Sequence, residues 1–150
     1  MLEQRLEQEI KAALLAGDSV KVTTLRGLKA NILSAKVADG TRGTDMADDQ
    51  IIAIFSKEAK KRQESADLYV QGGNQTMADA ELTEKALIET YLPAQLDESA
   101  VAAVVDQVIA EQNATDMKAM GQVIGAVKAK TAGAADGGLI ARLVKERLSQ

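Results

Sequence analysis

Apolar residues recur at every third or fourth position along most of this chain, which is the spacing of amphipathic α-helices. In the first half, the pattern predicts helices over about residues 2–16, 19–37, 49–71 and 77–91. Gly17 is a typical helix end and Asp18 a typical N-cap, so the first two helices are expected to be antiparallel neighbours. The polar loop over residues 38–47 that follows them is expected to be a mobile linker.

The same pattern predicts three more helices after Pro93, the single proline of the chain. Proline disfavours helical structure in the residue before it, so we expect a domain boundary at this point. The sequence therefore predicts an all-α protein with a four-helix domain over residues 1–93 and a three-helix domain over residues 94–150. The residues expected to begin or end the C-terminal helices are Asp97, Asn113, Asp116, Gly133 and Asp136.

Two glycines lie inside the predicted helix that follows Asp116. Gly121 and Gly125 are four residues apart and therefore share one helix face. Each costs roughly 1 kcal/mol relative to alanine, and a close approach by a neighbouring helix or by a binding partner would offset that cost. The candidate structural or docking residues are Gly121, Gly125, Gly133, Asp136, Gly137 and Pro93.

The composition excludes several kinds of chemistry. The chain has no cysteine and no histidine, so disulfides, thiolate or histidine zinc sites and a Ser-His-Asp triad are all excluded. No phosphate-binding or dinucleotide-binding glycine motif is present. We therefore expect no catalytic residue, no metal and no cofactor. No apolar run is long enough to span a membrane and no signal peptide opens the chain, which favours a cytoplasmic protein without a membrane partner.

Charge gives the remaining functional lead. The formal net charge is −4, yet residues 116–150 carry six cations against three anions, a local charge of +3. This excess predicts contact with a phosphate backbone, although cations also gather at helix C-termini for dipole reasons. A second basic cluster lies in the predicted helix over residues 49–71, where a solvated face is the alternative. The candidate nucleic-acid-binding residues are Lys118, Lys128, Lys130, Arg142, Lys145, Lys60 and Arg62.

Several segments resemble one known family. They are TLRGLKANI from Thr24, KKRQES from Lys60, ETYLPAQL before the predicted boundary, and MGQVIGAVKAKTAGAADGGLIARLVKERL from Met120. Together they identify the chain as a member of the GatB/YqeY family, similar to its free-standing YqeY-like proteins. Asn74 and Ala134 stand at two positions where the family often has a basic residue.

The resemblance implies that the C-terminal domain is similar to the tail of the B subunit of aspartyl/glutamyl-tRNA amidotransferase. That tail helps to hold tRNA, while amide transfer occurs in other domains. The family also implies a carbon–nitrogen ligase with glutamine as amide donor. Three hypotheses follow: an accessory module that binds tRNA or another structured RNA, a protein-interaction adaptor, and a component of an amidotransferase. The sequence does not indicate an oligomeric state.

Overall fold

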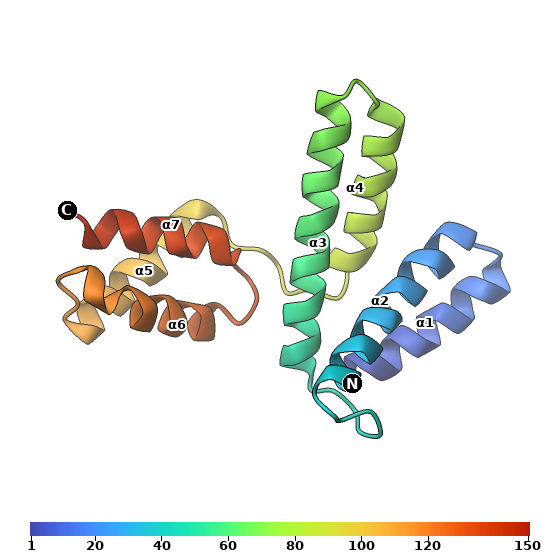
Figure 1. Ribbon diagram of the computed structural model, residues 1–150, viewed down its shortest axis with the longest axis horizontal. Helices are drawn as coiled ribbons and strands as arrows, with labels where there is room; N and C mark the ends of the chain where they lie inside the picture. Colours follow the sequence, from blue (N-terminus) through green and yellow to red (C-terminus); the bar gives the residue numbers. More distant parts are fainter. The chain divides into compact units, whose positions relative to one another are not determined.

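The computed structural model describes residues 1–150 and contains only helices, so the prediction of an all-α protein is confirmed (Figure 1). The helices are α1 (Leu2–Ala16), α2 (Ser19–Ala38), α3 (Asp48–Gln71), α4 (Gln75–Glu89), α5 (Glu98–Gln112), a short 3-10 helix η1 (Met117–Ala119), α6 (Met120–Thr131) and α7 (Gly137–Leu148). None of them is both long enough and apolar enough to cross a membrane. The chain divides into an N-terminal unit, Met1–Leu92, and a C-terminal unit, Pro93–Gln150.

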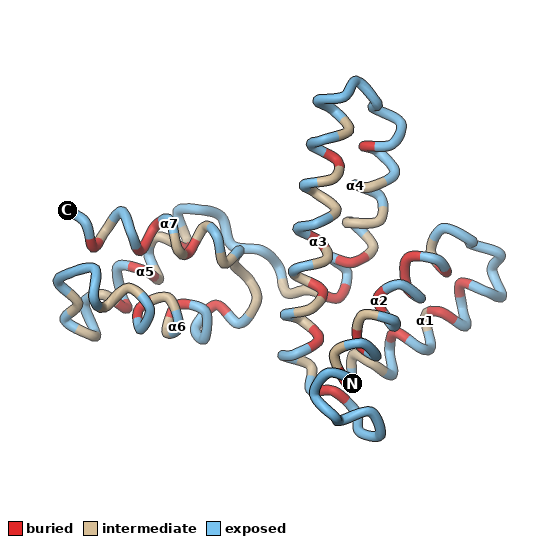
Figure 2. Tube along the Cα trace, in the orientation of Figure 1, coloured by how far each residue is buried: buried red, intermediate tan, exposed pale blue.

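The N-terminal unit consists of two helical hairpins, α1–α2 and α3–α4 (Figure 1). Their apolar stripes meet in one core, and Figure 2 marks the buried residues of these helices in red. Phe55 is fully buried and packs edge-to-face against Tyr91, with ring centroids 5.5 Å apart. The buried core residues are Leu6, Ile10, Leu25, Leu28, Ile32, Met46, Ile51, Phe55, Ala59, Ile88 and Tyr91.

Polar contacts join the end of the second hairpin to α1. The Tyr91 hydroxyl donates a hydrogen bond to the Glu9 carboxylate, which also pairs with Arg5 at 2.8 Å. The Arg5 guanidinium lies 4.4 Å from the centre of the Tyr91 ring and donates to the Thr90 carbonyl oxygen. Burial, followed by the hydrogen bond to Glu9, raises the pKa of Tyr91, so the ring stays neutral. These contacts fix where the chain leaves the N-terminal unit.

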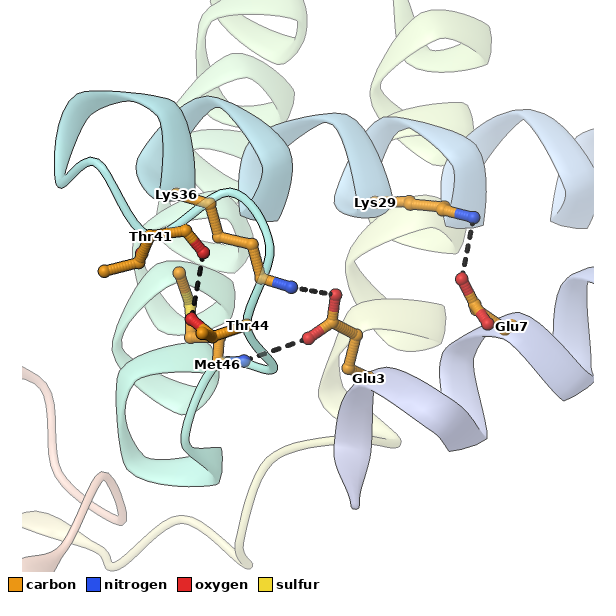
Figure 3. Close-up of polar contacts among 7 residues, drawn as sticks. All are labelled: Glu3, Glu7, Lys29, Lys36, Thr41, Thr44 and Met46. Carbon is orange, nitrogen blue, oxygen red and sulfur yellow. Dashed lines mark hydrogen bonds and ion pairs between the residues drawn. The ribbon is translucent and has the colours of Figure 1, made fainter.

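The connection between α2 and α3 is held at its far end, which differs from the mobile linker expected. Met46 is buried in the core, and its backbone N–H donates to the Glu3 carboxylate at 3.0 Å. The other oxygen of Glu3 lies 2.5 Å from the Lys36 ammonium, and Figure 3 shows both contacts converging on one carboxylate. The sequence pattern missed this anchor because Met46 stands alone in a polar segment.

Helix starts follow the sequence closely, with three differences. The side chains of Asp18, Asp97 and Asp136 accept backbone N–H bonds as N-caps of α2, α5 and α7. Asp116 was expected to begin the glycine-bearing helix, but it caps the short η1, and α6 begins only at Met120. Asn74 caps α4, which therefore begins at Gln75, two residues earlier than expected. The helix α3 begins at Asp48, one residue earlier than expected, and Asp48 is therefore its first residue. Its carboxylate accepts from the Leu2 N–H at 2.9 Å.

The C-terminal unit is a three-helix bundle of α5, α6 and α7. Its buried residues are Val101, Val105, Val108, Val123, Val127, Ile140, Leu143, Val144 and Leu148. The segment before α5 is attached to the α6–α7 loop, because the Leu96 N–H donates to the Ala134 carbonyl at 2.7 Å and the Gln95 amide donates to the Gly133 carbonyl at 3.0 Å. The division between the units therefore falls just before a segment that belongs to the bundle.

Ala132 ends α6 in the left-handed region, with φ 46°. Because a Cβ is strained there and glycine is not, Ala132→Gly is expected to raise the free energy of unfolding by about 0.5–1 kcal/mol. Urea denaturation followed by far-ultraviolet circular dichroism measures the change. Ala129→Gly, inside α6, is the control and should lower stability by about 1 kcal/mol. Loss of stability in both variants would contradict strain at Ala132.

Candidate nucleic-acid interface

Three of the six cations in residues 116–150 form ion pairs with α5. Lys130 pairs with Glu111 at 3.0 Å, and Arg147 pairs with Asp106 at 2.9 Å. Arg142 pairs with Glu98 at 2.9 Å and also with Glu146, its neighbour on α7. The hydrogen bond from Lys130 lowers the pKa of Glu111, and the hydrogen bond to Glu98 raises the pKa of Arg142. The local charge of +3 is therefore largely offset by acids that lie outside that segment.

The other three cations are Lys118, Lys128 and Lys145. All three side chains are exposed, and none forms an ion pair with a carboxylate. Exposed ammonium groups without acidic partners can approach an anionic ligand without first breaking an internal contact. The structure therefore separates the cations of residues 116–150 into three that pair with acids of α5 and three that remain available.

Two of the available lysines share one face of the α6 region. Lys118, Gly121, Gly125 and Lys128 follow each other at spacings of three, four and three residues, so they form an exposed stripe. The two lysines are separated by roughly 15 Å along the helix axis, at 1.5 Å per residue. Between the two lysines no side chain projects from Gly121 or Gly125, so the helix backbone is accessible there. We call these four residues the α6 stripe.

The glycines of the α6 stripe do not pack inside the bundle. A Cβ added at Gly121 or Gly125 would meet no atom within 4 Å. Of the two explanations for these glycines, packing within the domain is therefore contradicted, and an approach by a partner stays a hypothesis. The first explanation failed because periodicity places both glycines on one face but does not say which face the bundle covers.

Replacing Gly125 with alanine is expected to raise the free energy of unfolding by up to about 1 kcal/mol, because the new methyl group meets open space and the helix gains propensity. Thermal or urea denaturation measures this change. Gly17→Ala is the comparison, since Gly17 has φ 71° and alanine there is strained. A destabilised Gly125→Ala protein would mean that another group lies against this face.

Lys128 reaches the amino end of the next helix. Its Cε and Nζ atoms lie 3.5 and 3.6 Å from the position that a Cβ on Gly137 would take. Gly137 is the first residue of α7, and Asp136 caps that helix by accepting from the Leu139 N–H at 3.1 Å. The amino end of a helix carries partial positive charge, which the Asp136 carboxylate already complements here, and Lys128 places a cation close to that end.

The remaining candidate residues have mainly local roles. Gly133 has φ 87°, which places it in the left-handed turn after α6, and Pro93 begins the C-terminal unit. Lys60 and Arg62 belong to the N-terminal unit, where Lys60 is exposed on α3. Arg62 lies 3.2 Å from Glu84 and 3.6 Å from Glu81, both on α4, so this guanidinium is engaged within its own hairpin. No three acidic side chains gather in a way that could hold a metal ion.

The sequence matches the family model described as YqeY-like protein over residues 3–148, nearly the whole chain. The chain belongs to the YqeY-like family. This confirms the resemblance drawn from the TLRGLKANI and MGQVIGAVKAK segments. The match extends over both units, so the N-terminal and C-terminal units are both part of the YqeY-like family model.

Curated relatives of this YqeY-like chain come from yeasts. It is 33% identical over 89 residues to "Altered inheritance of mitochondria protein 41, mitochondrial" of Eremothecium gossypii, covering 59% of this chain and 48% of the relative. Identity is 30% to the protein of the same name from Vanderwaltozyma polyspora, covering 58% of this chain and 46% of the relative. Identity is 25% to the protein of the same name from Kluyveromyces lactis, covering 84% of this chain and 69% of the relative. The chain thus spans about half the length of the first two relatives.

The expectation of a cytoplasmic location is contradicted by these relatives, because all of them are named as mitochondrial proteins. That expectation rested on the lack of a signal peptide and of a membrane span. Neither feature distinguishes the cytoplasm from the interior of an organelle, so the inference had no physical basis for choosing between them.

Proposed function

We propose that this YqeY-like chain is an accessory RNA-associated module that contacts the phosphate backbone of tRNA or another structured RNA. The observation that carries the proposal is the set of exposed lysines without acidic partners, Lys118, Lys128 and Lys145. Lys128 supports it most directly, because its ammonium lies beside the amino end of α7. A phosphate oxygen beside this exposed ammonium would form a charge-assisted contact with it.

The side chains favour backbone contact over reading of bases. The C-terminal unit contains no aromatic residue on which a base could stack, since Phe55, Tyr69 and Tyr91 all belong to the N-terminal unit. The α6 stripe has no bulky side chain between its two lysines, so a sugar–phosphate chain could lie close to the helix. Recognition would then depend on the shape and charge of a folded RNA.

Filter binding of the purified chain to total tRNA over a salt series tests this proposal. We expect binding at low salt that weakens as salt rises, because phosphate contacts release counterions. A single-stranded homopolymer of equal length serves as competitor and should displace folded tRNA poorly. Undetectable binding at micromolar protein and low salt would exclude the function.

A protein-interaction adaptor is the second candidate, favoured by the open face at Gly121 and Gly125. Glycines on a helix surface allow a partner helix to approach closely. Recovery of one specific protein after nuclease treatment, and its loss in a Gly121→Leu/Gly125→Leu variant, would favour the adaptor over the RNA module. Involvement in amide transfer, which the family resemblance implies, is tested by supplying glutamine, ATP and misacylated tRNA and measuring amidated product.

A further inference from the structure

The α3–α4 hairpin is packed differently along its length. At its base, Phe55, Ala59 and Ile88 belong to the core of the N-terminal unit. Toward the turn, the buried residues of these two helices are Ala66 and Ala78 alone. Figure 2 shows this end of the hairpin mostly in the colours of exposed and intermediate residues. We call residues 62–84 the hairpin tip, and it is joined by a seam of very small side chains.

A polar layer marks the boundary between the core and the hairpin tip. Arg62 lies between Glu81 and Glu84, and next to it Lys85 donates to the Gln63 side chain at 2.9 Å. The Nε of Arg62 and one carboxylate oxygen of Glu81 are buried without a hydrogen-bond partner in the protein. Polar atoms buried in this way reduce the net stability that the ion pairs supply.

The large apolar side chains of the hairpin tip do not strengthen this seam. Leu68 is 66% exposed, and Val70, Met77 and Leu82 are also exposed. Their apolar area stays in water, so it contributes little to holding α3 and α4 together. Two buried alanines, the partly buried Tyr69, the polar layer and the short turn oppose separation of the two helices.

We propose that the hairpin tip opens as a cooperative unit of its own, with α3 and α4 separating near the turn while the core below the Arg62–Glu81–Glu84 layer stays folded. Regions with few buried apolar contacts open at lower free energy than the core to which they are attached. Opening uncovers Ala66 and Ala78 and frees the carboxylates of Glu81 and Glu84. This opening of the hairpin tip does not depend on the lysines in the C-terminal unit.

Native-state hydrogen exchange on the full chain tests the proposal. We expect amides of residues 66–83 to be about a hundredfold less protected than those around Leu25, Phe55 and Ile88, with a weaker dependence on denaturant. The weaker dependence follows because a local opening exposes little surface. Equal protection and equal denaturant dependence in both regions would overturn the proposal, since the hairpin would then open only with the whole unit.

Two variants define the role of the polar layer. Arg62→Met leaves Glu81 and Glu84 part-buried without their cation, so exchange in the hairpin tip should rise by about tenfold or more while the core is unchanged. Lys57→Met is the matched control, because it removes the same charge from an exposed α3 side chain that forms no ion pair and should change exchange less than about twofold. Equal effects of the two variants would overturn the assigned boundary.

A compensated variant keeps the test decisive if Arg62→Met disturbs folding. Arg62→Met/Glu81→Leu/Glu84→Leu replaces the polar layer with apolar side chains of similar size. We expect it to slow exchange of the hairpin tip below the wild-type rate, because the charges of Arg62, Glu81 and Glu84 are removed and apolar packing is gained. Unchanged or faster exchange in the tip of this variant would contradict the inference that the polar layer permits opening.

Discussion

Replacing Glu3 with glutamine is expected to lower the free energy of unfolding of the N-terminal unit by about 3–5 kcal/mol, because it leaves the Lys36 ammonium buried without its counter-charge. Lys36 is only 7% exposed, and Glu3 is the carboxylate that pairs with it. The same carboxylate accepts from the Met46 N–H, so the loop before α3 should also loosen. Urea denaturation followed by circular dichroism measures the loss, and hydrogen exchange of residues 40–47 locates it.

A matched control lies one turn away. Glu7 and Lys29 form a second ion pair between α1 and α2 at 2.9 Å, but both side chains are about half exposed (Figure 3). Glu7→Gln should therefore cost no more than about 1 kcal/mol. Equal losses in the two variants would show that the effect comes from net charge or helix propensity, and not from the burial of Lys36.

The same contrast predicts a response to acid. Burial alone would raise the pKa of Glu3, but hydrogen bonds from Lys36 and Met46 and the nearby lysine charge lower it below its ordinary 4.5. A carboxyl group with a lowered pKa in the folded protein contributes stability above its unfolded pKa. That contribution is lost as the pH falls through the folded value. Stability should thus decline below about pH 4.5, and less steeply in Glu3→Gln than in the wild type.

Removing Lys118, Lys128 and Lys145, the exposed lysines without acidic partners, is expected to weaken tRNA binding strongly. A pair of unit charges about 4 Å apart in water contributes about 1 kcal/mol, so Lys118→Ala/Lys128→Ala/Lys145→Ala should weaken tRNA binding on the order of a hundredfold. The magnitude of the slope of log affinity against log salt should fall by about 2–3, since three phosphate contacts are lost. Filter binding at several salt concentrations gives both quantities.

The control variant removes the same number of positive charges, but from the N-terminal unit. Lys11→Ala/Arg26→Ala/Arg42→Ala removes three exposed cations of the N-terminal unit, none of which forms an ion pair. Either variant moves the formal net charge from −4 by three, to −7. If both variants weaken binding alike, the lysines of the C-terminal unit are not a specific contact surface.

Local chemistry made most of the fold predictable from the sequence. A regular apolar spacing, a run of Asp N-caps and one proline gave the helices and their order, because these signals act within a few residues. The errors at Asp48 and Met46 have a common cause. The Asp48 carboxylate binds Leu2, and Met46 joins the core beside Glu3, so both roles depend on contacts more than 40 residues away in sequence.

The candidate interface was harder to predict for the same reason. Counting charge over residues 116–150 gave a basic surface, but Glu98, Asp106 and Glu111 lie outside that segment and pair with half of its cations. Arg62 likewise meets its acids on the next helix. The three acids of α5 could have been noticed only by asking which residues face α6 and α7. Periodicity alone does not answer that question.

The anchor at Met46 also makes the α2–α3 connection a suitable place for engineering. Gly43 faces open space, and the chain beyond it is fastened again at Met46 before α3 begins. A peptide inserted after Gly43 would lengthen an already exposed segment, and loop closure becomes only slightly less favourable with length. An affinity tag or fluorophore placed there would allow surface immobilisation or labelling that leaves the lysines of the other unit untouched.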